Sequence, residues 1–65
     1  GFKPGQLVMV RDDDNNMWHT EKFSHYECDS AYPYKVVREE GKNVGWRECR
    51  HPTKEEWETF RNGES

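Results

Sequence analysis

Residues 3–12 read KPGQLVMVRD, and this stretch decides the fold class. Pro4 and Gly5 suit the central positions of a β-turn, because proline presets φ and glycine accepts a positive φ. The apolar, β-branched run that follows predicts a strand over residues 6–11. A turn followed at once by such a strand favours a small domain built mainly from β-strands.

Polar turns and apolar runs alternate along most of the remaining chain. Later strands are predicted at residues 17–26, 32–38 and 44–51. Short polar side chains at residues 12–16 predict the first turn, and Gly41 predicts the centre of a hairpin turn over residues 39–43. The two faces of the second strand are mixed in polarity, and a bulge near Phe23 and Ser24 would account for this.

The C-terminal part of the sequence predicts a capped helix. Thr53 and Glu56 have the spacing of a capping box, in which each side chain bonds the backbone N–H of the other residue. The helix is expected at about residues 54–62. Trp57 and Phe60 share one of its faces, so we expect both rings to dock the helix on the strands. A helix this short depends on that packing, because it is unstable alone.

These elements predict one domain over residues 1–65. We expect a small SH3-like or Tudor-like barrel of four to five antiparallel strands over about residues 5–52, with the short helix closing it. A chain of 65 residues has room for a single domain, and such a domain buries only about 60% of its unfolded surface. Three Phe, three Trp and three Tyr residues are therefore expected to supply much of the core.

Several short motifs carry a resemblance to known proteins. They are residues 3–12, Trp18, FSH at 23–25, YPY at 32–34 and GWRECRHP at 45–52. Over about residues 3–52 the chain resembles small uncharacterised proteins of gut Bacteroides-type bacteria and their phages, a resemblance that implies no activity. More loosely, the Pro-Gly-x-Leu-Val start and the Trp-bearing strand are similar to Tudor and other SH3-like barrels, which implies a fold only.

The charge is acidic overall but unevenly distributed. The net charge is −3, and residues 1–30 carry all of this excess. A duplex nucleic-acid binder usually has a dominant basic face and a high pI, unlike this chain. The sequence has neither an apolar run of bilayer length nor a signal-peptide pattern. With two cysteines, Cys28 and Cys49, a disulfide framework is not implied and their pairing stays open. We expect a soluble protein of the cytoplasm.

Two groups of residues invite a metal-binding interpretation. Asp12, Asp14 and Asn16 have the first spacings of an EF-hand loop, but the required Gly and the bidentate Glu are missing. The second group has zinc-binding residue types with unsuitable spacing, and consists of His25, Cys28, Cys49 and His51. We therefore predict no metal site and no cofactor. The sequence also lacks a nucleophile, base and orienting group in a recognisable motif, so we predict that the protein is not an enzyme.

The candidate binding surface combines aromatic and basic residues, which are typical of interface hot spots. It consists of Tyr32, Tyr34, Arg47 and Arg50. Pro33 stiffens the segment between the tyrosines, and pairing of the predicted third and fourth strands would bring an arginine within reach of the rings. We predict a noncatalytic binding module with a protein partner, which would be a host factor if the chain is of phage origin.

Two alternatives remain at the level of the sequence. The first is nucleic-acid binding through a neighbouring aromatic and the basic residues Lys42, Arg47, Arg50 and Lys54. The second is mimicry of nucleic acid by the acidic residues Asp12, Asp13 and Asp14. The candidate surface has a structural alternative as well: both tyrosines would pack inward and the arginines would neutralise Glu39, Glu40 and Glu48. The identity of the partner, the source organism and the oligomeric state do not follow from the sequence.

Overall fold

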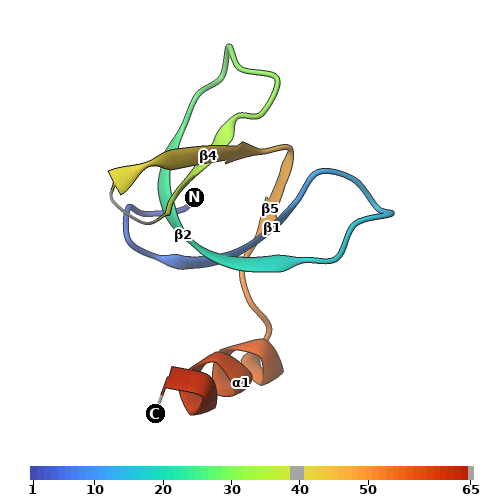
Figure 1. The fold of residues 1–65 in the computed structure, drawn as a ribbon, viewed down its shortest axis with the longest axis vertical. Helices are drawn as coiled ribbons and strands as arrows, with labels where there is room; N and C mark the ends of the chain where they lie inside the picture. Colours follow the sequence, from blue (N-terminus) through green and yellow to red (C-terminus); the bar gives the residue numbers. More distant parts are fainter. Residues whose placement is uncertain (39–40, 65) are drawn as a thin grey trace.

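The protein consists of five strands and a C-terminal helix (Figure 1). The computed structural model describes residues 1–38 and 41–64. Its elements are β1 (Leu7–Arg11), β2 (His19–Tyr26), β3 (Tyr34–Val37), β4 (Asn43–Trp46), β5 (Glu48–Arg50) and α1 (Lys54–Glu64). The predicted mainly β domain with a C-terminal helix is confirmed. Within the described ranges, no helix combines the length and the apolar character needed to cross a membrane.

All strand pairs are antiparallel and form one sheet in the order β4-β3-β2-β1-β5. The sheet is open. Its two edge strands are β4, which pairs with β3, and β5, which pairs with β1. Gly5 and Gly41 adopt positive φ values of 84° and 74°, as their predicted turns require. Glu39 and Glu40, which belong to the predicted second hairpin turn, lie outside the described residues.

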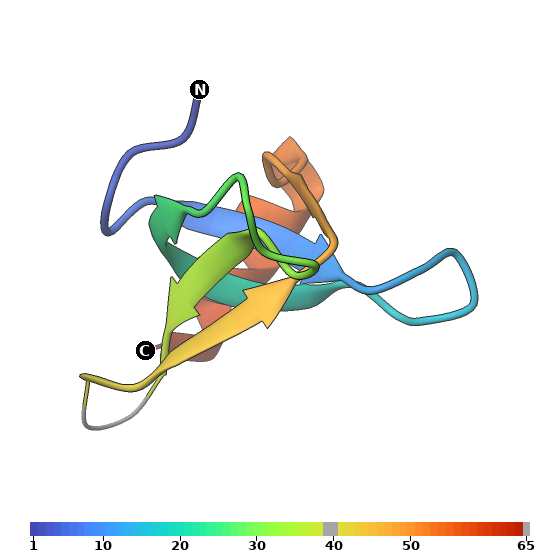
Figure 2. The same cartoon turned by 90° about the horizontal axis from the view of Figure 1, so that it is seen from above.

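The predicted fourth strand is in fact two strands. A single strand was expected over residues 44–51, but β4 ends at Trp46 and β5 begins at Glu48. The break at Arg47 carries the chain from one edge of the sheet to the other, as Figure 2 shows from above. The backbone N–H of Arg47 donates to Asp12 Oδ1 at 3.4 Å. The bend therefore follows from pairing with β1 and β3, since no glycine or proline stands at position 47.

The core lies around β1, which is buried on both faces. Val8 and Val10 are completely buried and pack with Phe23 and Val36 on one face. On the opposite face Leu7 and Met9 are also buried, and Met9 lines a recess of about 440 Å³ beneath α1. Burial on both faces explains why residues 7–10 are continuously apolar instead of alternating.

The bulge expected near Phe23 and Ser24 is confirmed. The register between β2 and β3 shifts between Phe23 and His25. Phe23 remains opposite Val36 in the core, while Tyr26 comes to lie opposite Tyr34. The shift therefore lets one strand contribute both to the core and to an aromatic row at the end of the sheet.

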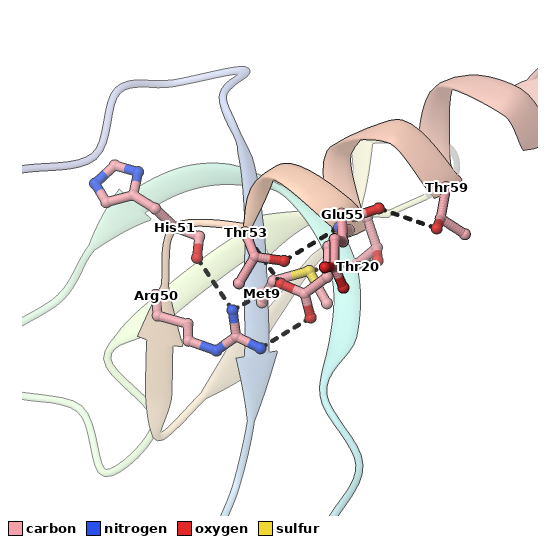
Figure 3. Close-up of polar contacts among 8 residues, drawn as sticks. Met9, Thr20, Arg50, His51, Thr53, Glu55 and Thr59 are labelled. Atoms are coloured by element: carbon pink, nitrogen blue, oxygen red, sulfur yellow. Dashed lines mark hydrogen bonds and ion pairs between the residues drawn. The ribbon is translucent and has the colours of Figure 1, made fainter.

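The capping box predicted for α1 is formed. Thr53 N–H donates to Glu56 Oε1 at 2.9 Å, and Glu56 N–H donates to Thr53 Oγ1 at 3.1 Å. The Glu56 carboxylate also accepts two hydrogen bonds from the Arg50 guanidinium on β5. In Figure 3 this guanidinium lies between the carbonyl of His51 and the first turn of the helix.

The prediction that both helix rings dock on the strands is wrong for Trp57. Phe60 lines the recess beneath the helix together with Met9. Trp57 is 44% exposed and contacts Phe60 edge-on, with the ring centroids 6.2 Å apart. Glu56 and Phe60, four residues apart, occupy the face toward the sheet. Trp57 is rotated about 100° away from Glu56 and therefore lies toward solvent.

Candidate functional site

Three aromatic residues form a row across one end of the sheet. Tyr26 on β2 is opposite Tyr34 on β3, which is opposite Trp46 on β4. The rings of Tyr26 and Tyr34 meet edge to face with their centroids 5.2 Å apart. Such pairs are stabilising beyond the area they bury. The row thus presents two tyrosine rings in a fixed relative orientation.

The N-terminal segment completes an open groove beside this row. The Phe2 ring lies 5.5 Å from that of Phe23, 6.3 Å from that of Tyr34 and 4.7 Å from that of His51. The groove has a volume of about 580 Å³. We call it the aromatic groove, and its lining consists of Gly1, Phe2, Pro4, Phe23, Ser24, His25, Tyr26 and Tyr34. Tyr26 is its most accessible ring, with 55% of the residue exposed.

A chain of polar contacts begins at Ser24 and His25, which line the aromatic groove. Ser24 Oγ lies 2.9 Å from His25 Nδ1, and His25 Nε2 lies 2.8 Å from Glu27 Oε1. The other Glu27 oxygen is 3.7 Å from the ammonium of Lys35. The hydrogen bond from His25 and the nearby Lys35 charge lower the pKa of Glu27. The Glu27 carboxylate is therefore ionised at neutral pH and is already paired with His25 and Lys35.

Tyr32 lies on the other face of the sheet from Tyr34. A Cβ added to Gly45 would lie 2.5 Å from the Tyr32 carbonyl oxygen and 2.8 Å from Tyr32 Cβ. The next residue, Trp46, points to the opposite face and packs on the core with Tyr34. Tyr32 is 41% exposed, so it is not buried in the core. The two predicted tyrosines therefore belong to different surfaces.

The structure separates the two predicted arginines as well. The Arg47 guanidinium lies 5.0 Å from the centroid of the Tyr32 ring. Arg50 is instead on β5, where its guanidinium lies 4.5 Å from the Trp18 ring and bonds Glu56. The expected contact between a tyrosine and one of these arginines exists for Arg47, whereas Arg50 belongs to the connection between the sheet and α1. We call Tyr32 and Arg47 the corner site.

Several of the described arginines form ion pairs with acidic side chains. Arg11 bonds Glu48 at 3.1 Å and Arg38 bonds Glu21 at 2.7 Å, while Arg50 bonds Glu56. Of the four basic residues considered for nucleic-acid binding, Arg50 is therefore paired with a carboxylate.

The loop of residues 12–16 projects away from the sheet in both views (Figures 1 and 2). Asp13 Oδ1 caps the turn of this loop by accepting a hydrogen bond from the backbone N–H of Asn15 at 2.8 Å.

The cysteine and histidine residues considered as zinc ligands contact different neighbours. His25 contacts Ser24 and Glu27, whereas His51 Nδ1 lies 2.8 Å from Gln6 Nε2. Cys28 is exposed and Cys49 is half-buried on β5, and both are free thiols. Burial raises the pKa of Cys49 to about 11. In the described part of the chain, no three His, Cys, Asp or Glu side chains converge to hold a metal ion.

The binding surface predicted from the sequence does not include three residues that shape these surfaces. Phe2 and Tyr26 line the aromatic groove, and Gly45 leaves the space in which Tyr32 lies. The exposed position of Tyr26 depends on the bulge in β2, whose effect on register a sequence does not reveal. Gly45 carried a usable signal, because a glycine inside a strand often marks a close backbone approach.

Comparison with known proteins adds no relative to this picture. No family model, curated protein or solved structure matches the chain. The function is therefore argued from the aromatic groove.

Proposed function

We propose that the protein is a noncatalytic binding module that holds an extended, proline-rich segment of a partner protein in the aromatic groove. The observation that carries this proposal is the edge-to-face pair of the exposed Tyr26 and the half-buried Tyr34, beside Phe2. Aromatic-lined grooves on small β domains bind polyproline II segments, which are already extended and lose little entropy on binding.

The charge of the groove favours a neutral ligand over a cation or a nucleotide. A methylated ammonium would be favoured by a free carboxylate beside the rings, but Glu27 is engaged by His25 and Lys35. Stacked bases would bring phosphates that need unpaired basic side chains. The side chain of Lys35 is only 18% exposed, and its ammonium lies 3.7 Å from Glu27 Oε2. An apolar segment with exposed carbonyls fits these surroundings better.

We place the fold among SH3-like barrels as part of the same proposal. Five antiparallel strands, with β4 and β5 on opposite edges and a sharp bend between them, support this assignment. The aromatic row of Tyr26, Tyr34 and Trp46 would then lie at one end of the barrel. Nucleic-acid binding through Lys42, Arg47, Arg50 and Lys54 is less well supported, because Arg50 is paired with Glu56.

A titration with a blocked decaproline peptide, followed by two-dimensional NMR, tests the proposal. We expect saturable shift changes at Phe2, Tyr26 and Tyr34, and their loss in Tyr26→Ala and Tyr34→Ala. Trp57→Ala is the matched control. It removes an exposed aromatic residue on α1 that does not line the groove, so the variant should retain binding. Absence of saturable changes would contradict the proposal. Binding of a single-stranded oligonucleotide with steep salt dependence would support the alternative instead.

A further inference from the structure

The bulge in β2 brings two neighbouring side chains together in the lining of the aromatic groove. Successive side chains of a regular strand point to opposite faces, so Ser24 and His25 would not meet there. The register shift between Phe23 and His25 leaves Ser24 as the extra residue of β2, without a partner on β3. Ser24 Oγ lies 2.9 Å from His25 Nδ1, and both residues line the groove. The bulge therefore places a hydroxyl and an imidazole on the same side of the strand.

The Glu27 carboxylate determines which nitrogen of His25 carries the proton. His25 Nε2 lies 2.8 Å from Glu27 Oε1, and an ionised carboxylate accepts hydrogen bonds without donating any. Nε2 therefore carries the proton of the neutral imidazole, which leaves Nδ1 as an acceptor. The hydroxyl of Ser24 then donates to His25 Nδ1. Because this hydroxyl has a single proton, Ser24 Oγ offers lone pairs alone to a ligand in the groove.

The lone pairs of Ser24 distinguish proline from other residues of an extended ligand. Proline has a backbone carbonyl but no backbone N–H, and a carbonyl forms no hydrogen bond with another acceptor. A non-proline residue at the same place can donate its backbone N–H to Ser24 Oγ. Ser24 is half-buried, and leaving a polar group unsatisfied where a ligand covers it is unfavourable. The arrangement with the N–H is therefore preferred.

We infer that Ser24 is a specificity-determining residue of the aromatic groove, and that it selects a proline-rich segment in which a non-proline residue donates its backbone N–H to Ser24 Oγ. This inference rests on the proposed function and describes the partner of the same groove more closely. His25 is a positioning residue, because it acts on the ligand through the direction of the Ser24 hydroxyl.

Protonation of His25 should reverse the hydrogen bond to Ser24. Histidine is the residue type that ordinarily gains a proton between about pH 8 and pH 5, and both ring nitrogens are then donors. Nε2 keeps its bond to Glu27, while Nδ1–H donates to Ser24 Oγ. This reversal frees the hydroxyl proton of Ser24 for a ligand carbonyl, so acid should weaken the preference for an N–H.

The other ionisable groups near the groove do not distinguish an N–H from its absence. Lys35 is opposite His25 on β3, and its ammonium lies 3.7 Å from the second oxygen of Glu27. Lysine and tyrosine side chains ordinarily keep their charge state below about pH 8. Protonation of His51, whose ring lies 4.7 Å from that of Phe2, or of the Gly1 amino group acts equally on two ligands that differ in an N–H. The ratio of two affinities therefore isolates Ser24.

Two blocked nine-residue peptides test the inference, one with the repeat Pro-Pro-Ala and the other with N-methylalanine in place of each alanine. They have the same carbonyls and side chains and differ at the backbone nitrogen of every third residue. At pH 7.5 we expect the alanine peptide to bind about five-fold more tightly, the effect of one hydrogen bond. Ser24→Ala should remove this difference. At pH 5 the ratio for the unmodified protein should fall to one or below.

Two histidine variants separate the role of His25 from general effects of acid. In His25→Gln the ratio of affinities should be the same at pH 7.5 and pH 5, because the glutamine side chain does not gain a proton. His19→Gln is the matched control, since His19 is on the same strand but contacts Trp46 and does not line the groove. This variant should retain the decrease in acid.

The possible failures are distinguishable. Failure of both peptides to bind would overturn the proposed function and this inference with it. Equal affinities at pH 7.5, or tighter binding of the N-methylated peptide, would overturn the role of Ser24 while leaving the proposed function intact. Retention of the full difference in Ser24→Ala would overturn it as well, because another acceptor would then select the N–H. A ratio that does not change with pH in the unmodified protein would overturn the positioning role of His25.

Discussion

Arg50 and Glu56 join the sheet to the helix through two parallel hydrogen bonds. Arg50 Nη1 donates to Glu56 Oε1 at 2.7 Å, and Nη2 donates to Oε2 at 2.9 Å. The same carboxylate accepts from the backbone N–H of Thr53. Glu56 thus caps α1 and fixes it to β5 with one side chain. The donors from Arg50 and then Thr53 hold the pKa of Glu56 at about 2.

Replacing Glu56 by Gln should destabilise the fold. The variant loses the ionic contact with Arg50 and weakens the capping box, and we expect a loss of about 1 kcal/mol in the free energy of unfolding. Urea denaturation followed by tryptophan fluorescence measures it. Glu58→Gln is the matched control, because Glu58 lies on the exposed face with Trp57. Equal midpoints for the two variants would show that the Arg50–Glu56 contact is not stabilising.

The contribution of Glu56 should disappear in acid. Its folded-state pKa of about 2 lies below the ordinary value of 4.5, so the unfolded chain takes up a proton first as the pH falls. The stabilisation is complete above about pH 4.5 and decreases as the pH falls toward 2. The difference in unfolding free energy between the unmodified protein and Glu56→Gln should therefore shrink from pH 6 to pH 2. A difference that is constant over this range would contradict the assignment.

The two helix rings should differ in their effect on stability. Phe60 lines the recess against Met9 and Thr20, so we expect Phe60→Ala to reduce the free energy of unfolding by about 2 kcal/mol, below the full value for a buried ring. Trp57 is 44% exposed, and Trp57→Ala should have less than half that effect. Thermal unfolding by circular dichroism compares the two. A larger loss in Trp57→Ala would mean that Trp57 is the docking residue after all.

The two cysteines should react at very different rates. The pKa of Cys49 is raised to about 11 by burial, so little of it is thiolate at pH 8, whereas Cys28 is exposed. Because the thiolate is the reactive form, iodoacetamide at pH 8 should label Cys28 first. Peptide mass spectrometry at timed intervals measures both sites, and labelling in urea gives the unprotected rate of each. Equal protection of the two thiols would be inconsistent with this placement.

Two glycines should respond in opposite directions to alanine. At Gly45 the new Cβ would lie 2.5 Å from a backbone oxygen of Tyr32, and we expect a loss of about 1–3 kcal/mol. At Gly63 on α1 a Cβ meets nothing within 4 Å, and alanine should increase stability by about 0.5 kcal/mol. Denaturation midpoints test both. An unchanged midpoint in Gly45→Ala would show that Tyr32 does not need the space.

Much of the fold was accessible from local sequence signals. The capping box of Thr53 and Glu56 predicts the start of α1, because both partners lie within one turn. The strand over Leu7–Arg11 follows from its apolar run. The bend at Arg47 could not be predicted, since neither glycine nor proline stands at position 47 and the bend arises from pairing with two different strands. The pairing of β5 with β1, which sets the order of the open sheet, likewise depends on long-range geometry.

The candidate site was predictable in composition but not in arrangement. The contact of Arg47 with Tyr32 fulfils the expectation that an aromatic and an arginine meet. Tyr34, however, faces Phe2 and Tyr26 on the other surface. Its separation from Tyr32 arises because Pro33 precedes β3, so the two tyrosines do not follow the alternation of one strand. Sequence patterns give side-chain types, whereas the face of each side chain depends on where the strand begins.

The position of β5 has a consequence for how the chain folds. The other strand pairs join neighbours in sequence, but β5 pairs Arg50 with Met9, near the opposite end of the chain. Closing so long a loop has a high entropic cost, which makes the pairing of β5 with β1 slow. We therefore expect β5 to pair after the hairpins have formed. A nascent chain on the ribosome would meanwhile expose one edge of β1, the most apolar strand. Such an edge can pair with other chains, which makes the interval before β5 emerges the period of greatest aggregation risk.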